Sequence, residues 1–426
     1  MENKKIFIQI ASYRDPELLP TLKDCIEKAK YPENLVFSIA WQHSPEDTWD
    51  TLTAYTDDKR FKIIDINYLD SKGVCWARHV LQQQYDNEEY TLQLDSHHRF
   101  EQDWDEGLIT MYNQLREKGY EKPLLTGYVP SYDPNNDPAG RINVPWTMNF
   151  DRFSPEGVIH TMPATIDNYK ELDEPVRARF YSAHFAFTTG QFVKEVPHDP
   201  TYYFHGEENS IAFRSYTWGY DSFHPHRVFI WHEYTRKDKK KHWDDVKDWY
   251  IKNNESFARN RRLFGMDGEV YNEEEFGPYG RGKVRSIEDY EKFSGLSFKR
   301  RSVQQYTLDK KLPPNPIIED PEEYEKSFVR VFKHCIDVGY DRVPEKDYDF
   351  WVVAFHRENT TNDPGEDTTL YRKDADKSEI DRLMNDPDKY CKIWREFQTS
   401  IQPKYWVVWP HSISKGWCER LTGNLS

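Results

Sequence analysis

Short apolar runs alternate with helically spaced apolar positions over the first hundred residues of the chain. Runs at 6–11, 35–41, 61–66 and 90–94 predict strands, and apolar residues three and four apart at 18–30 and 74–85 predict helices. Strands and helices that alternate at these lengths predict an α/β fold around a mostly parallel, doubly wound sheet. Ligands of such sheets bind beyond the carboxyl ends of the strands, where residues 12–15 and 95–97 fall.

The middle of the chain continues this pattern after an interruption. Residues 128–175 are rich in Pro, Asn and Asp, which predicts a long loop over a substrate site. Strand-like runs at 179–188 and 228–231 then flank a predicted helix at 206–218.

The last third of the chain predicts a second, smaller domain. Frequent Gly and Pro between 265 and 316 place a domain junction there, and the tail has strand-like runs at 350–355 and 405–409 and a helix-like run at 322–338. An accessory domain of this kind would serve acceptor recognition or oligomerisation. We therefore expect a catalytic domain at 1–265, a linking extension at 266–315, and an α+β or β-rich domain at 316–426.

Composition narrows the class of protein. The net charge of −15 argues against broad binding to nucleic acid or an anionic membrane, and the basic run at 236–241 is expected to be a solvated loop. Five widely spaced cysteines without a C-x-x-C pair indicate neither a disulfide framework nor a zinc ribbon. With no apolar stretch of about 18 residues, these features predict a soluble, cytoplasmic protein. The many aromatic residues fit stacking on sugars or bases and core packing equally well.

Asp95 and His97 are the first candidate for chemistry. They stand just past a predicted buried strand, so a carboxylate and an imidazole would face the same spot in the following loop. A divalent cation held there could bridge a donor diphosphate and neutralise the charge of the leaving group. The alternative is a helix-capping Asp beside a surface His. The nearby Asp103-Trp-Asp105 has a similar pattern, but it precedes an amphipathic run and predicts a helix N-terminus.

Two later segments could complete such a site. Glu207 and Glu208 open a predicted helix, where they could interact with the helix dipole or place a carboxylate on an acceptor hydroxyl. His232 ends a predicted strand and could add a neutral imidazole to the metal shell, or could be structural.

Several motifs together resemble a known enzyme family: the cytoplasmic GlcNAc-transferases that modify hydroxyproline on a ubiquitin-ligase adaptor protein. The resemblance covers roughly residues 5–300. It rests on Ala11-Ser-Tyr-Arg-Asp15, Gly73-Val-Cys-Trp-Ala-Arg78, Gln93-Leu-Asp-Ser-His-His-Arg-Phe100, Ser182-Ala-His-Phe-Ala-Phe187, Glu195-Val-Pro-His-Asp-Pro200, residues 206–221, His232-Glu-Tyr234, Ser286-Ile-Glu-Asp-Tyr290 and Phe293-Ser-Gly-Leu-Ser-Phe298.

The layout is also similar to the polypeptide GalNAc-transferases, and the two resemblances imply a site. They imply a GT-A (Rossmann-like) glycosyltransferase domain that uses a UDP-sugar donor, with Asp95, His97 and His232 binding Mn²⁺ or Mg²⁺. The residues implied near the uridine or diphosphate are Ser12, Arg14, Asp15, Arg78 and Asp95.

The resemblance further implies transfer of GlcNAc to a protein or glycan hydroxyl with retention of configuration. Glu207 and Glu208 would orient the acceptor and support positive charge at the anomeric carbon. The sequence departs from the GalNAc-transferases at Ser210, where those enzymes carry a second Glu. Two alternatives stay open: a transferase acting on modified nucleic acid, and a non-catalytic protein that binds carbohydrate or nucleotide.

Overall fold

The computed structural model describes residues 4–49, 51–236, 238–358, 368–387 and 389–425. The chain divides into two compact units. The first unit is formed by residues 1–300 and 306–317, and the second by residues 301–305 and 318–426.

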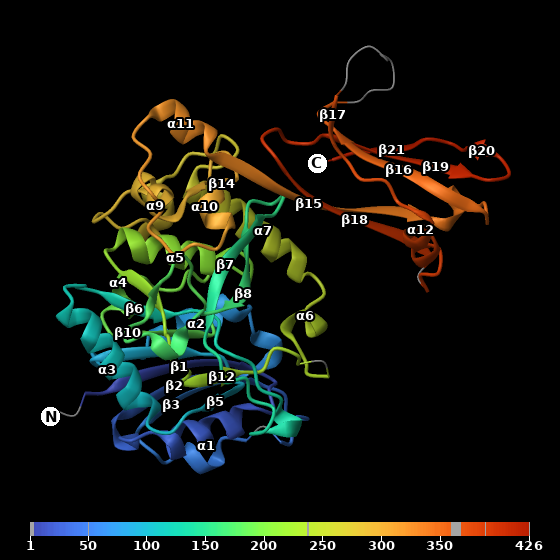
Figure 1. The fold of residues 1–426 in the computed structure, drawn as a ribbon. Coiled ribbons are helices and arrows are strands. Elements are labelled where there is room, and N and C mark those ends of the chain that lie inside the picture. The colour runs from blue at the N-terminus through green and yellow to red at the C-terminus, as the bar shows by residue number, and fades with distance from the viewer. Residues whose placement is uncertain (1–3, 50, 237, 359–367, 388, 426) are drawn as a thin grey trace. The chain divides into compact units, whose positions relative to one another are not determined.

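An eight-stranded sheet forms the centre of the first unit. Its strands are β1 (Ile6–Tyr13), β2 (Leu35–His43), β3 (Phe61–Asn67), β4 (Tyr90–Leu94), β6 (Pro123–Thr126), β9 (Val176–Arg177), β10 (Phe185–Thr189) and β11 (Asp221–His224). Their order is β3-β2-β1-β4-β10-β6-β11-β9 (Figure 1). Strands β3 to β4 and the β6–β11 pair run parallel, whereas β10 and β9 run antiparallel to their neighbours. The predicted α/β class with a mostly parallel sheet is confirmed.

Helices cover both faces of this sheet because strand residues buried on both sides need apolar cover on both. Helices α1 (Leu18–Lys28) and α3 (Trp104–Glu117) pack on one face, where the core includes Ile8, Leu22 and Trp104. Helices α2 (Val74–Gln82) and α5 (Glu207–Thr217) lie on the other face, with Leu81 and Ile211 in the core (Figure 1).

Strand register positions the site residues. In the parallel β1–β4 pair Ile10 lies opposite Leu94, so residues 11–15 and 95–97 leave the sheet at the same edge. A separate antiparallel pair, β5 (His98–Phe100) with β12 (Ile230–His232), sets His232 opposite His98. Residues far apart in the chain therefore meet beyond the carboxyl end of β4.

The region expected to be one long loop, 128–175, instead contains a hairpin. Strands β7 (Trp146–Phe153) and β8 (Ile159–Thr165) pair antiparallel. Alternation along β7 explains the difference, since apolar Met148 and Phe150 alternate with polar residues as in a strand. The Pro, Asn and Asp content that predicted a loop belongs largely to the flanking turns.

The rest of the chain up to residue 317 is mainly helical. Its elements are α4 (Phe192–Glu195), α6 (His242–Asp245), α7 (Trp249–Phe264), α8 (Glu273–Phe276), α9 (Ile287–Ser294), β13 (Leu296–Ser297) and α10 (Gln305–Leu308). The stretch expected to link two domains therefore has helices of its own. Buried Arg179 connects this stretch to the rest of the first unit, because its guanidinium donates to the carbonyl of Ser294 and to Asn315 Oδ1.

The second unit is β-rich, as predicted. One sheet contains β14 (Ser302–Gln304), β15 (Phe328–Gly339) and β18 (Tyr390–Thr399); another contains β16 (Tyr348–His356), β17 (Thr369–Arg372), β19 (Tyr405–Ser412), β20 (Gly416–Trp417) and β21 (Leu421–Asn424). Its helices are α11 (Pro321–Lys326) and α12 (Lys377–Leu383). A shared apolar core holds Ile336, Trp351, Val353 and Val408.

The helix predicted at 322–338 is wrong for most of its length. Asp320 caps only the short α11, and the chain is then strand from Phe328. Phe328, Phe332 and Ile336 mimic helical spacing, but residues 330–339 pair along their whole length with β18.

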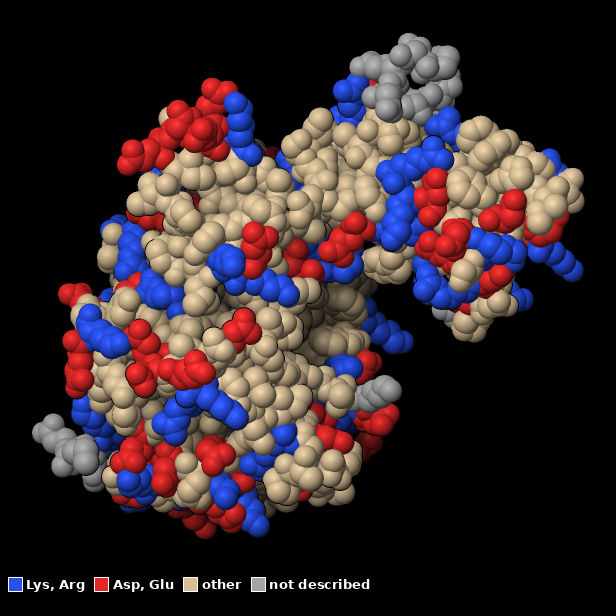
Figure 2. Space-filling view, viewed as in Figure 1, with Lys and Arg blue, Asp and Glu red and all other residues tan. Residues whose placement is uncertain are grey.

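No helix among the described residues is long and apolar enough to cross a membrane. On the face of the first unit seen in Figure 2, acidic and basic side chains are intermingled rather than gathered by sign.

Candidate functional site

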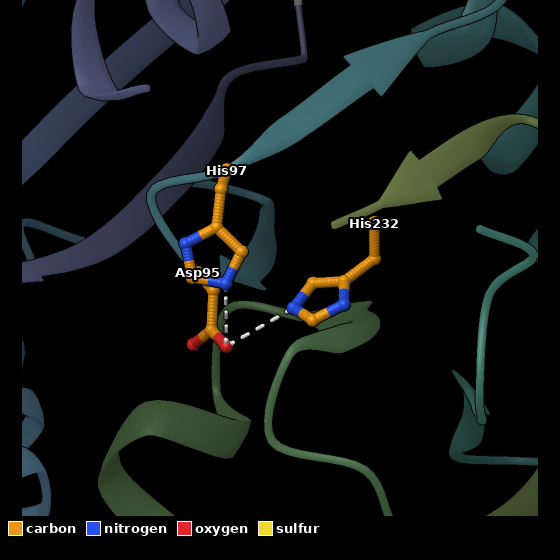
Figure 3. A group of neighbouring side chains, drawn as sticks. All are labelled: Asp95, His97 and His232. Atoms are coloured by element: carbon orange, nitrogen blue, oxygen red, sulfur yellow. Dashed lines mark hydrogen bonds and ion pairs between the residues drawn. The ribbon is translucent and has the colours of Figure 1, made fainter. Parts of the chain in front are cut away.

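Asp95, His97 and His232 converge at the edge of the sheet (Figure 3). Asp95 Oδ2 lies 3.7 Å from His97 Nε2 and 3.4 Å from His232 Nε2. One ligand atom from each residue falls within 4.8 Å of the other two, and both histidines are buried. Sequence analysis predicted this grouping, and the structure brings all three residues together.

Asp15 fixes the orientation of His97. Asp15 Oδ2 accepts a hydrogen bond from Ser96 Oγ at 2.6 Å and lies 2.7 Å from His97 Nδ1. Burial would raise the pKa of Asp15, but His97, Arg236 and Ser96 outweigh burial and hold it below its usual value. Because an ionised carboxylate only accepts, His97 Nδ1 donates to it, and Nε2 is the ring nitrogen that faces Asp95.

Burial keeps His232 and His184 neutral. Desolvation, with His97 and His98 nearby, lowers the pKa of His232 to about 3 despite the opposing influence of Asp95. The ring of His184 stacks on His232 at a centroid distance of 4.4 Å, and burial lowers its pKa well below the usual range. Burial would raise the pKa of Asp95, but the hydrogen bond to His232 and the positive charge of Arg78 outweigh burial and hold this pKa well below its usual value.

These three residues fit a divalent cation. A carboxylate and two imidazoles are a donor set that suits Mn²⁺ and related ions. The Asp15–His97 hydrogen bond is the outer-shell contact that metal-binding histidines commonly make. Asp95 and His97 also line a neighbouring cavity.

Arg78 connects Asp95 to the start of α5. Its Nη2 donates to Asp95 Oδ1 at 2.8 Å, and its Nη1 donates to Glu207 Oε1 and Oε2 at 3.0 and 2.9 Å. Two carboxylates thus already engage the guanidinium that the family resemblance implied near the diphosphate.

The two adjacent carboxylates at the start of α5, Glu207 and Glu208, have pKa values shifted in opposite directions. Burial would raise the pKa of Glu207, but Arg78 and His198 lower it to about 2. Burial, together with the charge of Glu207, raises the pKa of Glu208 to about 7, although the Ala183 N–H donates to its Oε1 at 2.8 Å. Glu207 is therefore an ion-pair partner, and Glu208 can hold or release a proton near neutral pH.

Ser12 and Arg14 lie along the same sheet edge but do not reach the metal ligands. Ser12 is buried, and its carbonyl accepts from Gln42 Nε2. Arg14 has a positive φ of 46°, pairs with Asp47 and Asp245 at 2.8 and 3.0 Å, and stacks over the ring of Tyr68.

Three residues of the basic run at 236–241 border the site, so the expectation of a solvated loop holds only for part of the run, such as the exposed Asp238 and Lys240. Arg236 Nη2 lies 3.2 Å from Asp15 Oδ2, and its side chain is only 22% exposed. Together with Lys240 and Lys241 it lines a cavity of about 130 Å³ that Asp95 and His97 also line. The available signal was position, because the run follows His232 directly at the end of a strand.

Aromatic side chains form the other wall of this cavity. Phe204 and Trp243 line it with a ring-centroid distance of 5.7 Å, and both are exposed. Sequence analysis did not single out either residue. Cations beside flat rings suit a ligand that joins a heterocyclic base to phosphate groups.

Comparison with known proteins identifies a family but no close relative. The model of a family described as Glycosyltransferase (GlcNAc) matches residues 5–62 and 50–300, more than half of the chain. No curated protein matches the chain.

Solved structures give only remote likenesses. GalNAc-T7 with UDP, GalNAc and Mn²⁺ has 13% identity and a TM-score of 0.46, covering 68% of this chain and 54% of that chain. S. aureus TarS 1-349 in complex with UDP has 10% identity and a TM-score of 0.37, covering 61% and 72%. The mannosyltransferase PcManGT from Pyrobaculum calidifontis, in complex with GDP-Man and Mn²⁺, has 9% identity and a TM-score of 0.34, covering 55% and 59%.

Proposed function

Since the chain belongs to the GlcNAc glycosyltransferase family, we propose that it is a GT-A enzyme that transfers GlcNAc from UDP-GlcNAc to a hydroxyl of a protein or glycan. The observation that carries the proposal is the convergence of Asp95, His97 and His232 beside a cavity lined by cations. The resemblance to hydroxyproline-modifying enzymes places hydroxyproline among the acceptors to test. We place the reaction in the cytoplasm.

Asp95, His97 and His232 would hold Mn²⁺ or Mg²⁺, which neutralises charge on the departing diphosphate. Arg236, Lys240 and Lys241 bind the diphosphate from the opposite side. The buried Asp15 keeps His97 in the tautomer that exposes Nε2, and Arg78 holds Asp95 in place. Ser12 and Arg14 would support the nucleotide end of the site from the same edge of the sheet.

We propose retention of configuration. The acceptor oxygen forms its bond to the anomeric carbon on the face from which the diphosphate oxygen departs, and the hydroxyl proton passes to that oxygen. Glu208 orients the acceptor hydroxyl. Glu207 contributes negative charge near the anomeric carbon while it remains paired with Arg78.

The first prediction tests the metal site directly. UDP release from UDP-GlcNAc should require Mn²⁺ or Mg²⁺ and should fall at least about 100-fold in Asp95→Ala and His232→Ala, because loss of a ligand exceeds the effect of losing its outer-shell partner. The assay is run on a panel of UDP-sugars, with His43→Ala as a histidine control outside the site.

Two results would contradict the proposal. UDP release that persists without metal, or in both Asp95→Ala and His232→Ala, would show that the reaction does not depend on a metal ion at this site. Binding of UDP with Mn²⁺ but no turnover of any donor would instead favour a non-catalytic nucleotide-binding protein.

A further inference from the structure

A cavity of about 1060 Å³ lies in the first unit next to the metal ligand His232. Glu233 and Tyr234, which follow His232 in the chain, line this cavity, and the ring centroids of Tyr234 and His232 are 4.4 Å apart. Its volume exceeds that of the cation-lined cavity several-fold. A ligand placed in it would lie close to the ion-binding residues without occupying the nucleotide site.

Aromatic rings form much of the wall. Tyr128, Trp146 and Tyr234 line the cavity, with ring centroids 6.0 Å apart for Trp146 and Tyr234 and 6.5 Å apart for Tyr128 and Tyr234. Tyr234 is 42% exposed, so its ring is accessible. Such rings offer large, rigid apolar faces at a low cost in conformational entropy.

Acidic residues dominate the charge of the lining. Glu17, Asp133, Glu233 and Asp238 contribute carboxylates, against Lys239 among the described lining residues. Lys239 is already neutralised, because its Nζ lies 2.6 Å from Glu233 Oε2 and 3.5 Å from Glu17 Oε1. A cavity of this charge repels phosphodiester polymers, nucleic acids included.

The strongest hydrogen-bond donors of the lining are already engaged. Tyr234 donates its hydroxyl to the carbonyl of Val129 at 2.8 Å, and Tyr128 Oη pairs with Thr161 Oγ1 at 2.8 Å.

Glu17 and Glu233 already accept from Arg99 and Lys239 at 2.7 and 2.6 Å. Asp238 is an exposed carboxylate of the lining, and because a carboxylate only accepts, the cavity suits a ligand that brings hydrogen-bond donors. Saccharide hydroxyls meet that need, whereas a proline-rich peptide offers carbonyl acceptors and lacks N–H donors at each proline.

We propose that this cavity is the acceptor site and that its occupant is an uncharged saccharide, whose pyranose rings lie against Trp146 and Tyr234. The proposal rests on the proposed function. The saccharide hydroxyl oxygen would bond to the anomeric carbon as the bond from that carbon to the diphosphate oxygen breaks, and the hydroxyl proton would leave with the diphosphate.

Binding to a glycan array tests the site without requiring turnover. The labelled full chain, with UDP and Mn²⁺, is applied to neutral oligosaccharides, anionic oligosaccharides and hydroxyproline peptides on one surface. We expect retention on neutral oligosaccharides, weakened about tenfold or more in Trp146→Ala and largely restored in Trp146→Phe. Trp49→Ala, an exposed tryptophan of the first unit that does not line this cavity, is the matched control and should bind as the wild type does.

A second variant tests the same cavity in case Trp146→Ala does not fold. Asp238 is exposed and lines the cavity, so Asp238→Lys should shift retention from neutral toward anionic oligosaccharides. Retention only on peptides or anionic polymers, or equal binding by all the variants, would overturn the proposal. Glycan binding by a chain that releases no UDP would contradict the transferase function and leave the cavity assignment standing.

Discussion

Glu207 and Glu208 are neighbours in sequence and opposites in protonation. Glu207 ionises readily because Arg78 and His198 face it, whereas burial beside Glu207 keeps Glu208 protonated up to a pKa of about 7. Sequence analysis identified the pair but could not separate the two residues. The difference depends on partners 129 and 9 positions away from Glu207, which only the fold brings into contact.

Glu208→Gln should stabilise the protein at pH 8 and change little at pH 5. The folded pKa lies above the ordinary value of 4.5, so ionising Glu208 costs stability as the pH rises toward 7, by up to about 3 kcal/mol. A glutamine can keep the hydrogen bond from the Ala183 N–H. Urea unfolding at the two pH values measures the effect.

Glu207→Gln is the matched comparison, and we expect it to change the stability at pH 8 in the opposite direction. The folded pKa of about 2 lies below 4.5, so the ionised Glu207 contributes stability above pH 4.5 that is lost as the pH falls toward 2. Removing it leaves Arg78 partly unpaired and should destabilise the protein at pH 8 by about 3 kcal/mol. Equal effects of both variants at pH 8 would contradict the assignment.

At the scale of elements, the sequence predicts the positions of strands and helices well where the apolar runs are short and end at polar or turn residues. Strands β1, β2 and β4 and helices α1 and α5 lie where the pattern placed them, and the loop after β4 contains Asp95 and His97. The pattern fails in β15, because Phe328, Phe332 and Ile336 are spaced as in a helix while long-range pairing with β18 decides the outcome. It also could not show that Arg236 reaches Asp15.

The segment that follows β12 yields an element-scale prediction. Lys240 and Lys241 line the cavity that we propose binds the nucleotide. Lys240→Gln with Lys241→Gln should therefore weaken UDP binding in the presence of Mn²⁺ by about tenfold or more and should reduce its dependence on salt. Isothermal titration at two salt concentrations measures both. Lys283→Gln, at a highly exposed position, is the control. Unchanged UDP affinity in the double variant would remove the segment from the nucleotide site.

At the scale of the whole molecule, the family match and the two units divide the chain at nearly the same place. The match ends at residue 300, and the β-rich unit contains residues 318–426. All the site residues discussed above belong to the first unit. The second unit is thus outside the residues that the family model matches, and we propose that it assists acceptor recognition or assembly.

Ending the chain at residue 317 tests that assignment. UDP release from the donor should remain within about twofold of the full chain, whereas transfer to a macromolecular acceptor should fall, because the first unit has its own core and both cavities. Donor turnover and transfer are measured on the same preparation. If both survive the truncation unchanged, the second unit has no part in recognition.

The separation of the metal ligands along the chain has a consequence for folding. Asp95 and His232 are 137 positions apart, and His232 reaches the site on a two-stranded sheet that is separate from the main one. An ion bound by both would cross-link distant parts of the chain and favour the native state by mass action. The melting temperature would then report metal occupancy, and a chelator would lower the thermal stability of the first unit as well as abolish its activity.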